Sequence, residues 1–166
     1  ILNGGFKGWA NGGNKVATGE NSITPASFKT KLNKKYFASF SEVQKAQKGK
    51  GQQCLIDARP AAFFTGDKKH AKARIPGRLA NARNLQEGNL IDDSFKMKSS
   101  SAIKSQFGGL DGVEQYKGYI SYCNTGHWAA TVWFGLSEIA QIPNVKMYDG
   151  GMTHWTSNPK RKVDLG

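Results

Sequence analysis

Cysteine is scarce in this chain, with only Cys54 and Cys123 among 166 residues. Two cysteines cannot build the multiple-disulfide framework of a small secreted scaffold. No cysteine or histidine lies at the spacing of a metal-binding motif, so the sequence indicates no metal site. Each cysteine therefore needs an explanation of its own.

Long apolar runs are also missing. The longest, residues 128–136, is interrupted by Thr131 and Gly135, and a membrane helix needs roughly 20 apolar residues. We therefore expect no membrane span. The first residues do not resemble a signal peptide, so the start of the chain indicates no compartment. Export to a periplasm or another oxidising compartment and a cytoplasmic location both stay open.

Acidic residues are few: 12 Asp and Glu stand against 24 Lys and Arg, which gives a net charge of +12. A basic surface attracts anions, so nucleic acid, an anionic membrane surface and small anionic substrates are candidate partners. The basic residues are spread along the chain, and no known nucleic-acid-binding motif is present, so we do not expect nucleic acid. A small anionic substrate remains open.

The two ends of the chain carry the same short pattern. Residues 2–9 and 148–155 both read apolar, Asx, Gly, Gly, apolar, two variable residues and Trp. We interpret each copy as a strand end, a Gly-Gly turn with positive φ and a helical turn that buries the tryptophan. If the second copy closes this domain, residues 1–20 are the end of a preceding domain plus a linker, and the domain proper spans residues 21–166. An ordinary N-terminal arm is the alternative.

Three short apolar runs, residues 54–57, 118–123 and 145–148, predict strands that are buried on both faces. An apolar stretch of helix length, residues 129–140, separates the last two. Such strand–helix–strand units form parallel sheets with helices on both faces, so we expect an α/β fold. A helix capped by Ser39 or Ser41 is expected before the first strand, and another helix or turn is expected to start at residues 24–25.

Cys123 ends a predicted strand and precedes the polar, turn-forming residues 124–127. Active sites of open parallel sheets lie beyond the carboxyl ends of the strands. The loop amides and the start of the following helix direct N–H groups and partial positive charge at the sulfur, which favours a thiolate nucleophile. A buried structural role is the alternative, and Cys54, at the start of a buried strand, fits that role.

Four motifs resemble those of rhodanese-type sulfurtransferases, and they occur along the chain in the same order as in that family. Residues 123–129 are similar to the active-site loop of that family, with glycine at the fourth position. Residues 55–66 resemble its first-strand motif, residues 75–77 its Ile-Pro-Gly turn, and residues 148–155 its closing motif. Tandem domains are common in the family, usually with the reactive cysteine in the second, in agreement with the repeated end pattern.

The chain also departs from the family. Arg74 precedes the Ile-Pro-Gly turn, where the family commonly has histidine. Asn124 and Thr125 are neutral where the thiosulfate enzymes have basic residues, and His127 and Trp128 are bulky. These departures leave the preferred sulfur donor open, although they do not argue against a thiolate at Cys123.

The resemblance implies a rhodanese-like three-layer fold, a central parallel sheet with helices on both faces, and a transferase that needs no cofactor. Cys123 would take sulfur from thiosulfate or a similar anionic donor, hold it as a persulfide and pass it to cyanide or a thiol. Arg59 would bind the donor's anionic group or pair with Asp57, and Asp57 would order the nearby loop. The expected pocket residues are Asn124, Thr125, Gly126, His127, Trp128 and Ala129.

Other functions fit parts of the pattern. Cysteine phosphatases and arsenate reductases have a loop of similar shape, but they typically carry arginine six positions after the cysteine, where this chain has Ala129. A non-catalytic rhodanese fold that binds protein or nucleic acid is a second alternative, although inactive members usually lose the cysteine. A sulfur carrier for an acidic acceptor protein also suits the basic surface.

Overall fold

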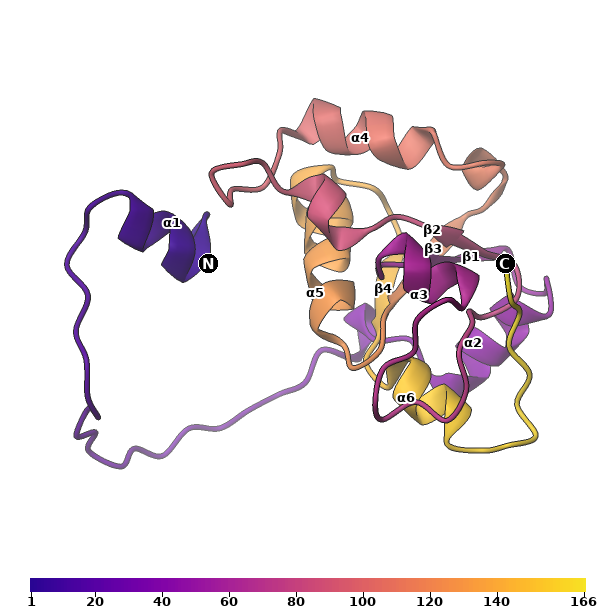
Figure 1. Cartoon of the computed structure of the whole chain (residues 1–166), viewed down its shortest axis with the longest axis horizontal. Helices are drawn as coiled ribbons and strands as arrows, with labels where there is room; N and C mark the ends of the chain where they lie inside the picture. Colours follow the sequence, from indigo (N-terminus) through magenta and orange to yellow (C-terminus); the bar gives the residue numbers. More distant parts are fainter.

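A computed structural model describes residues 1–166. Four parallel strands form one sheet in the order β2-β1-β3-β4 (Figure 1). They are β1 (Gln53–Asp57), β2 (Ala82–Asn84), β3 (Gly118–Tyr122) and β4 (Val145–Tyr148). The three predicted strands are confirmed, and β2 is an addition that the sequence did not indicate.

Helices lie before, between and after the strands. The α-helices are α1 (Gly5–Asn11), α2 (Phe40–Gln47), α3 (Ala61–Thr65), α4 (Ser100–Gly108), α5 (His127–Phe134) and α6 (Gly151–Thr156). Short 3-10 turns are η1 (Lys34–Tyr36), η2 (Glu87–Leu90) and η3 (Val113–Gln115), and α5 continues into a π-helical turn, η4 (Gly135–Ile139). No helix has the length and apolar character that crossing a membrane requires.

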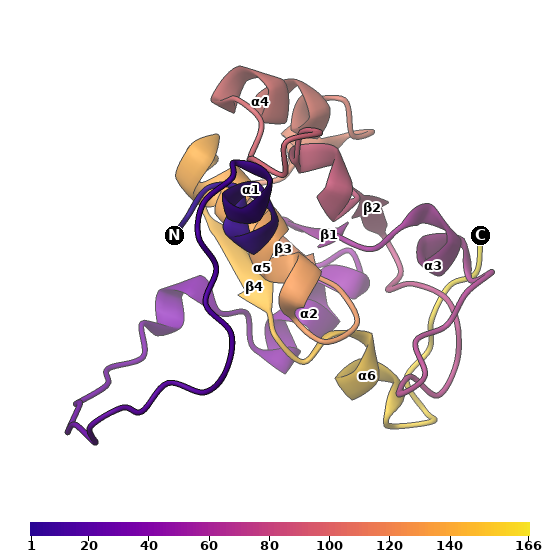
Figure 2. The ribbon, with the colours of Figure 1, turned by 60° about the vertical axis from the view of Figure 1, so that its left-hand side comes forward.

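Side chains of the strands alternate between two hydrophobic clusters, one on each face of the sheet. Cys54 and Ile56 of β1 pack with α4 and α5. Leu55 of β1 and Ile120 of β3 pack with α2 and α6 on the other face. Figure 2 shows the sheet between these helices. The three-layer α/β architecture with helices on both faces is therefore confirmed.

The four strands end at the same level. Asp57 pairs in register with Asn84 on one side and with Tyr122 on the other, and Tyr122 pairs with Tyr148. Each of these residues is the last of its strand. The segments that follow the strands therefore leave the same edge of the sheet side by side, as expected for the site of a parallel sheet.

Helix α2 shows how local sequence sets an element boundary. The Ser39 hydroxyl accepts a hydrogen bond from the Glu42 amide, and the Glu42 carboxylate accepts one from the Ser39 amide, which forms a capping box. Val43 and Ala46 are buried against the sheet. Of the two residues predicted as possible caps, Ser39 is the one that caps this helix.

The expectation of a helix or turn starting at residues 24–25 was wrong. Residues 12–33 contain no helix or strand and form a long arm that loops away from the sheet and its helices (Figure 1). Their apolar side chains remain exposed, with Ile23 at 86%, Phe28 at 85% and Leu32 at 65%. A short helix needs an apolar face buried against a neighbour, and this segment has none.

The repeated end pattern has a structural counterpart. A helix begins at the second glycine of each copy, where Gly5 has φ 53° and Gly151 has φ 54°. The first glycines differ, with φ 98° at Gly4 and φ −61° at Gly150, and a strand precedes the second copy alone. Trp9 and Trp155 each donate their indole N–H to a backbone carbonyl further along the chain, at Lys15 and at Lys162. However, Trp155 is buried at 2% exposure whereas Trp9 is 42% exposed, so the expected burial is found in the second copy alone.

The first residues also contact the domain. The Asn3 side chain accepts a hydrogen bond from the Met97 amide, and the Lys7 ammonium lies 5.0 Å from the centre of the Phe95 ring. Residues 1–5 face Ala130 and Phe134 of α5 across an apolar cavity. The segment before the linker is therefore anchored on the α5 side of the sheet.

Candidate active site

Cys123 directly follows β3, the strand between β1 and β4, and α5 begins four residues later at His127. Its side chain is buried, with 1% exposure, and the sulfur accepts a hydrogen bond of 3.1 Å from the Gly126 amide. The predicted order of strand, cysteine loop and helix is confirmed. A backbone amide directed at the sulfur stabilises negative charge there.

The closing motif holds the outside of this loop. The Met152 amide donates to the carbonyl of Cys123 at 2.8 Å, and Thr153 donates to the carbonyl of Asn124 through its amide and its hydroxyl, at 3.2 and 3.0 Å. A Cβ atom at Gly151 would lie 2.5 Å from both of these carbonyl oxygens. Only glycine allows α6 to approach the loop this closely.

Gly126 forms the second close contact between the two motifs. Its φ is 93°, and a Cβ atom there would lie 2.6 Å from a carboxylate oxygen of Asp149. The amide that bonds to the sulfur thus belongs to a residue that must be glycine. A side chain there would strain the backbone and would collide with Asp149. The active-site loop and the closing motif, far apart in sequence, form one structural unit.

The remaining loop residues divide into a buried and an exposed group. Ala129 is buried, and its carbonyl accepts a hydrogen bond from the Ser121 hydroxyl. Thr125 and His127 are exposed, with the threonine hydroxyl 3.3 Å from the imidazole Nδ1. Trp128 is half-buried, and its ring meets that of Phe63 edge to face at 6.0 Å. Exposed polar groups therefore stand in the same loop as the buried sulfur.

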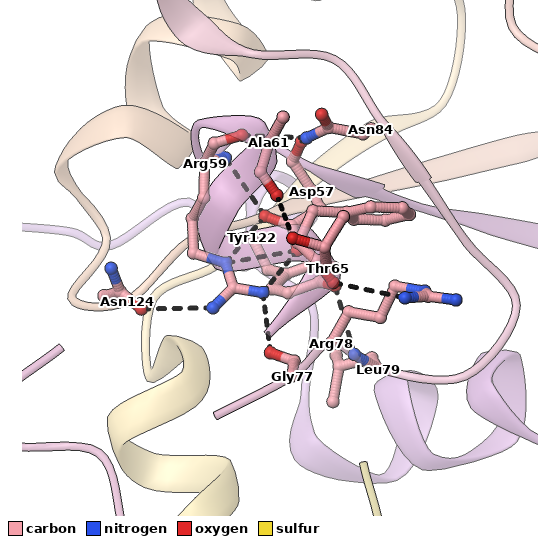
Figure 3. A network of polar contacts seen from close by, with 11 residues as sticks. Asp57, Arg59, Ala61, Thr65, Gly77, Arg78, Leu79, Asn84, Tyr122 and Asn124 are labelled. Atoms are coloured by element: carbon pink, nitrogen blue, oxygen red, sulfur yellow. Dashed lines mark hydrogen bonds and ion pairs between the residues drawn. The ribbon is translucent and has the colours of Figure 1, made fainter. Parts of the chain in front are cut away.

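Asp57 and Arg59 form a buried ion pair at the end of β1 (Figure 3). Arg59 donates from Nε to both carboxylate oxygens of Asp57 at 2.9 and 3.1 Å and from Nη2 to one of them at 2.6 Å. Burial disfavours the charge, but the hydrogen bonds and charge of Asp57 outweigh it and raise the pKa of Arg59. The pairing that the sequence left as one alternative is the one observed.

The same guanidinium joins two further segments. Its Nη2 donates to the carbonyl of Gly77 at 2.9 Å, and its Nη1 donates to the side-chain oxygen of Asn124 at 3.4 Å. Gly77 belongs to the Ile-Pro-Gly turn, so three of the four motifs meet at one side chain (Figure 3). Asp57 also accepts from the Arg59 amide at 3.0 Å, which orders the backbone after β1.

Sequence reasoning missed two residues of this network. Asn84, the last residue of β2, donates to the carbonyls of Asp57 and Arg59 at 2.9 and 2.8 Å. The hydroxyl of Tyr122 accepts from the Leu79 amide, and burial raises the pKa of this tyrosine well above its usual value. The signal for Asn84 was its place at a strand end, but β2 itself was not recognised.

Cys54 lies at the other end of the same sheet, in β1. It is buried among core residues with 1% exposure. Burial raises the pKa of its thiol to about 11, so this sulfur stays protonated near neutral pH. Its surroundings are those of a structural cysteine.

Residues 39–158 match the family model of the rhodanese-like domain. The chain belongs to this family. It is 29% identical over 165 residues to 3-mercaptopyruvate sulfurtransferase from Escherichia coli strain K12, and this match covers 99% of the chain and 57% of the relative. It is also 29% identical over 168 residues to thiosulfate sulfurtransferase from Gallus gallus, covering 98% of the chain and 56% of the relative.

A putative thiosulfate sulfurtransferase from Synechococcus elongatus is 27% identical over 169 residues, covering 95% of the chain and 50% of the relative. The chain thus spans about half the length of the curated relatives it matches. Among solved structures, EanB with a cysteine persulfide and ergothioneine superposes with a TM-score of 0.84 at 19% identity, over 99% of this chain and 41% of EanB. This likeness confirms the fold.

Proposed function

We propose that this chain is a sulfurtransferase that carries sulfur as a persulfide on Cys123. The observation that carries this proposal is the hydrogen bond from the Gly126 amide to the Cys123 sulfur, in a loop at the start of α5. A backbone amide stabilises a charged sulfur without requiring a side-chain base. The names of the curated relatives, thiosulfate and 3-mercaptopyruvate sulfurtransferase, support the same chemistry.

The reaction proceeds in two transfers of one sulfur atom. The Cys123 thiolate attacks the outer sulfur of thiosulfate, a new S–S bond forms, the old one breaks, and sulfite leaves with the bonding electron pair. Cyanide or a thiolate then attacks the outer sulfur of the persulfide, which returns the Cys123 thiolate and releases thiocyanate or a new persulfide. Neither transfer requires a metal or an organic cofactor.

The other loop residues take supporting roles in this proposal. The amides of the loop, from Asn124 to Ala129, stabilise the thiolate and the persulfide. Gly126 supplies the amide already bonded to the sulfur. His127 and Thr125, both exposed, are placed to position donor and acceptor, and half-buried Trp128 shields the sulfur from water. The basic surface attracts the anionic donor.

Two-substrate kinetics test this function. With thiosulfate and cyanide varied together, thiocyanate formation is expected to give parallel lines in double-reciprocal plots, because sulfite leaves before cyanide reacts. If thiosulfate and mercaptopyruvate both yield no transferred sulfur, the chain is a rhodanese fold without this activity. Salt-sensitive binding to DNA would then favour the nucleic-acid alternative.

We also propose that residues 1–20 are the closing element of a preceding rhodanese-like domain plus a linker, and that residues 21–166 are the catalytic domain. The matching turn angles of Gly5 and Gly151 and the matching indole hydrogen bonds of Trp9 and Trp155 support this proposal. The encoded sequence before Ile1 tests it. A second rhodanese-like sequence is expected there, and an unrelated sequence would contradict the proposal.

A further inference from the structure

Asn124, the residue after Cys123, has a buried amide group without a partner. The residue is 2% exposed, and its Nδ2 is the one buried side-chain nitrogen or oxygen in the structure that forms no hydrogen bond. Leaving such a donor unpaired costs free energy, so its presence needs an explanation. A ligand that accepts the hydrogen bond when it binds supplies that explanation.

The Arg59 guanidinium sets the orientation of this amide. The Asn124 oxygen accepts from Nη1 of Arg59 at 3.4 Å, and Figure 3 shows the amide nitrogen on the side away from the guanidinium. Turning the amide by 180° would place two N–H donors against each other, because arginine has no acceptor. The unpaired N–H groups of Asn124 therefore have a fixed direction.

Arg59 itself has little left to offer a ligand. Arginine has five N–H donors, of which Nε bonds to Asp57, Nη2 bonds to Asp57 and Gly77, and Nη1 bonds to Asn124. Its positive charge is paired with a carboxylate at 2.6 Å, and the side chain is 3% exposed. One N–H group of Nη1 remains without a partner, so a grip on a sulfonate through two N–H groups would require at least one of these bonds to break.

We propose that the Asn124 amide, rather than Arg59, donates to the anionic group of the molecule that reacts at Cys123, and that Arg59 positions this amide. This proposal rests on the proposed function and identifies how the same site recognises a small oxyanion, the sulfonate or carboxylate next to the transferred sulfur. Arg59 is thus a positioning residue. Its link to Asp57 and Gly77 keeps the Asn124 amide turned toward the anion.

A matched pair of alkylating reagents tests this recognition without any sulfur transfer. Iodoacetate and neutral iodoacetamide both alkylate a thiolate at CH2 with loss of iodide, and they differ in the carboxylate. The rate for each is followed by mass spectrometry of the peptide that contains Cys123. The ratio of the two rates reports anion recognition and cancels changes in the reactivity of the sulfur.

Asn124→Ala is expected to lower the iodoacetate-to-iodoacetamide ratio about 10- to 100-fold, the usual effect of a lost hydrogen bond to a charged group. Asn124→Asp is expected to lower it further, because an acceptor replaces the donor. Asn158→Asp makes the same change at an exposed residue whose side-chain oxygen accepts from the Lys160 amide, a bond that aspartate keeps. It is the control for net charge and should keep the ratio within about twofold.

A double variant separates positioning from direct binding. If Arg59 acts through Asn124, Arg59→Lys lowers the ratio in the wild-type background but has no added effect in Asn124→Ala. An unchanged ratio in Asn124→Ala, or independent losses that multiply in the double variant, would overturn the proposal. Failure to take sulfur from thiosulfate would instead refute the proposed function. The two outcomes are distinguishable because alkylation of Cys123 requires no sulfur transfer.

Discussion

Cys123→Ser is expected to lower sulfur transfer from thiosulfate to cyanide by on the order of 10³-fold or more. A serine hydroxyl does not ionise near neutral pH and cannot form a persulfide. The substitution changes one atom, and the Gly126 amide that bonds to the sulfur at 3.1 Å can bond to a hydroxyl instead. The loop should therefore keep its shape while the chemistry is lost.

Cys54→Ala is the matched control for this experiment. Cys54 lies in the core of the sheet, and burial keeps its thiol protonated by raising its pKa to about 11. Its removal should lower stability by about 1 kcal/mol through a small cavity and leave the transfer rate within about threefold. Full activity in Cys123→Ser, or loss of activity in Cys54→Ala with the fold intact, would contradict the assignment of the sulfur-transfer chemistry to Cys123.

Arg59→Ala is expected to lower the free energy of unfolding by about 3–5 kcal/mol, because the Asp57 carboxylate is left buried without its partner. Asp57 has 0% exposure, and three of its contacts are hydrogen bonds from the Arg59 side chain. Urea unfolding followed by circular dichroism measures the loss. In a chain of this size the melting temperature should fall by roughly 6–20 °C.

Two further variants separate the buried charge from other effects of losing arginine. Arg83→Ala removes an arginine whose partner Asp111 is 97% exposed at 3.8 Å, and it should cost less than about 1 kcal/mol. Asp57→Ala with Arg59→Ala removes both charges and should recover part of the stability lost in Arg59→Ala. Equal losses of unfolding free energy in Arg59→Ala and Arg83→Ala would mean that the buried ion pair stabilises the fold no more than an exposed one.

The part of the fold predicted from sequence is the part with a strong local signal. Strands β1 and β3 are mostly apolar and buried along almost their whole length, because helices cover both faces of the sheet. Helix α2 begins directly after Ser39 because residues 39–42 form a capping box, a signal that lies within four residues of sequence. Cys123 stood out because a polar, glycine-containing turn follows a buried strand and precedes an apolar helix.

The elements that were not predicted depend on tertiary contacts. Strand β2 has three residues and no apolar run, and its pairing with β1 defines it. Helix α4 begins with serines and buries two side chains, those of Ile103 and Phe107. For both, packing against the sheet outweighs a weak local preference.

The candidate site shows the same division. Cys123 and its loop are contiguous in sequence, so their pattern was readable. The buried contacts that join Asp57, Arg59, Gly77 and Asn124 link residues up to 65 positions apart. Their geometry depends on strands that end at the same level of the sheet, which local sequence does not specify. The partners of Arg59 in the folded chain could therefore be identified from the structure alone.

The intact mass of the protein after incubation with thiosulfate tests the central claim most directly. A gain of roughly 32 Da, one sulfur atom, is expected on the wild-type chain and on Cys54→Ala, with complete loss after cyanide is added and no gain in Cys123→Ser. No gain on the wild-type chain with thiosulfate or mercaptopyruvate, or a gain that persists in Cys123→Ser, would contradict a persulfide on Cys123.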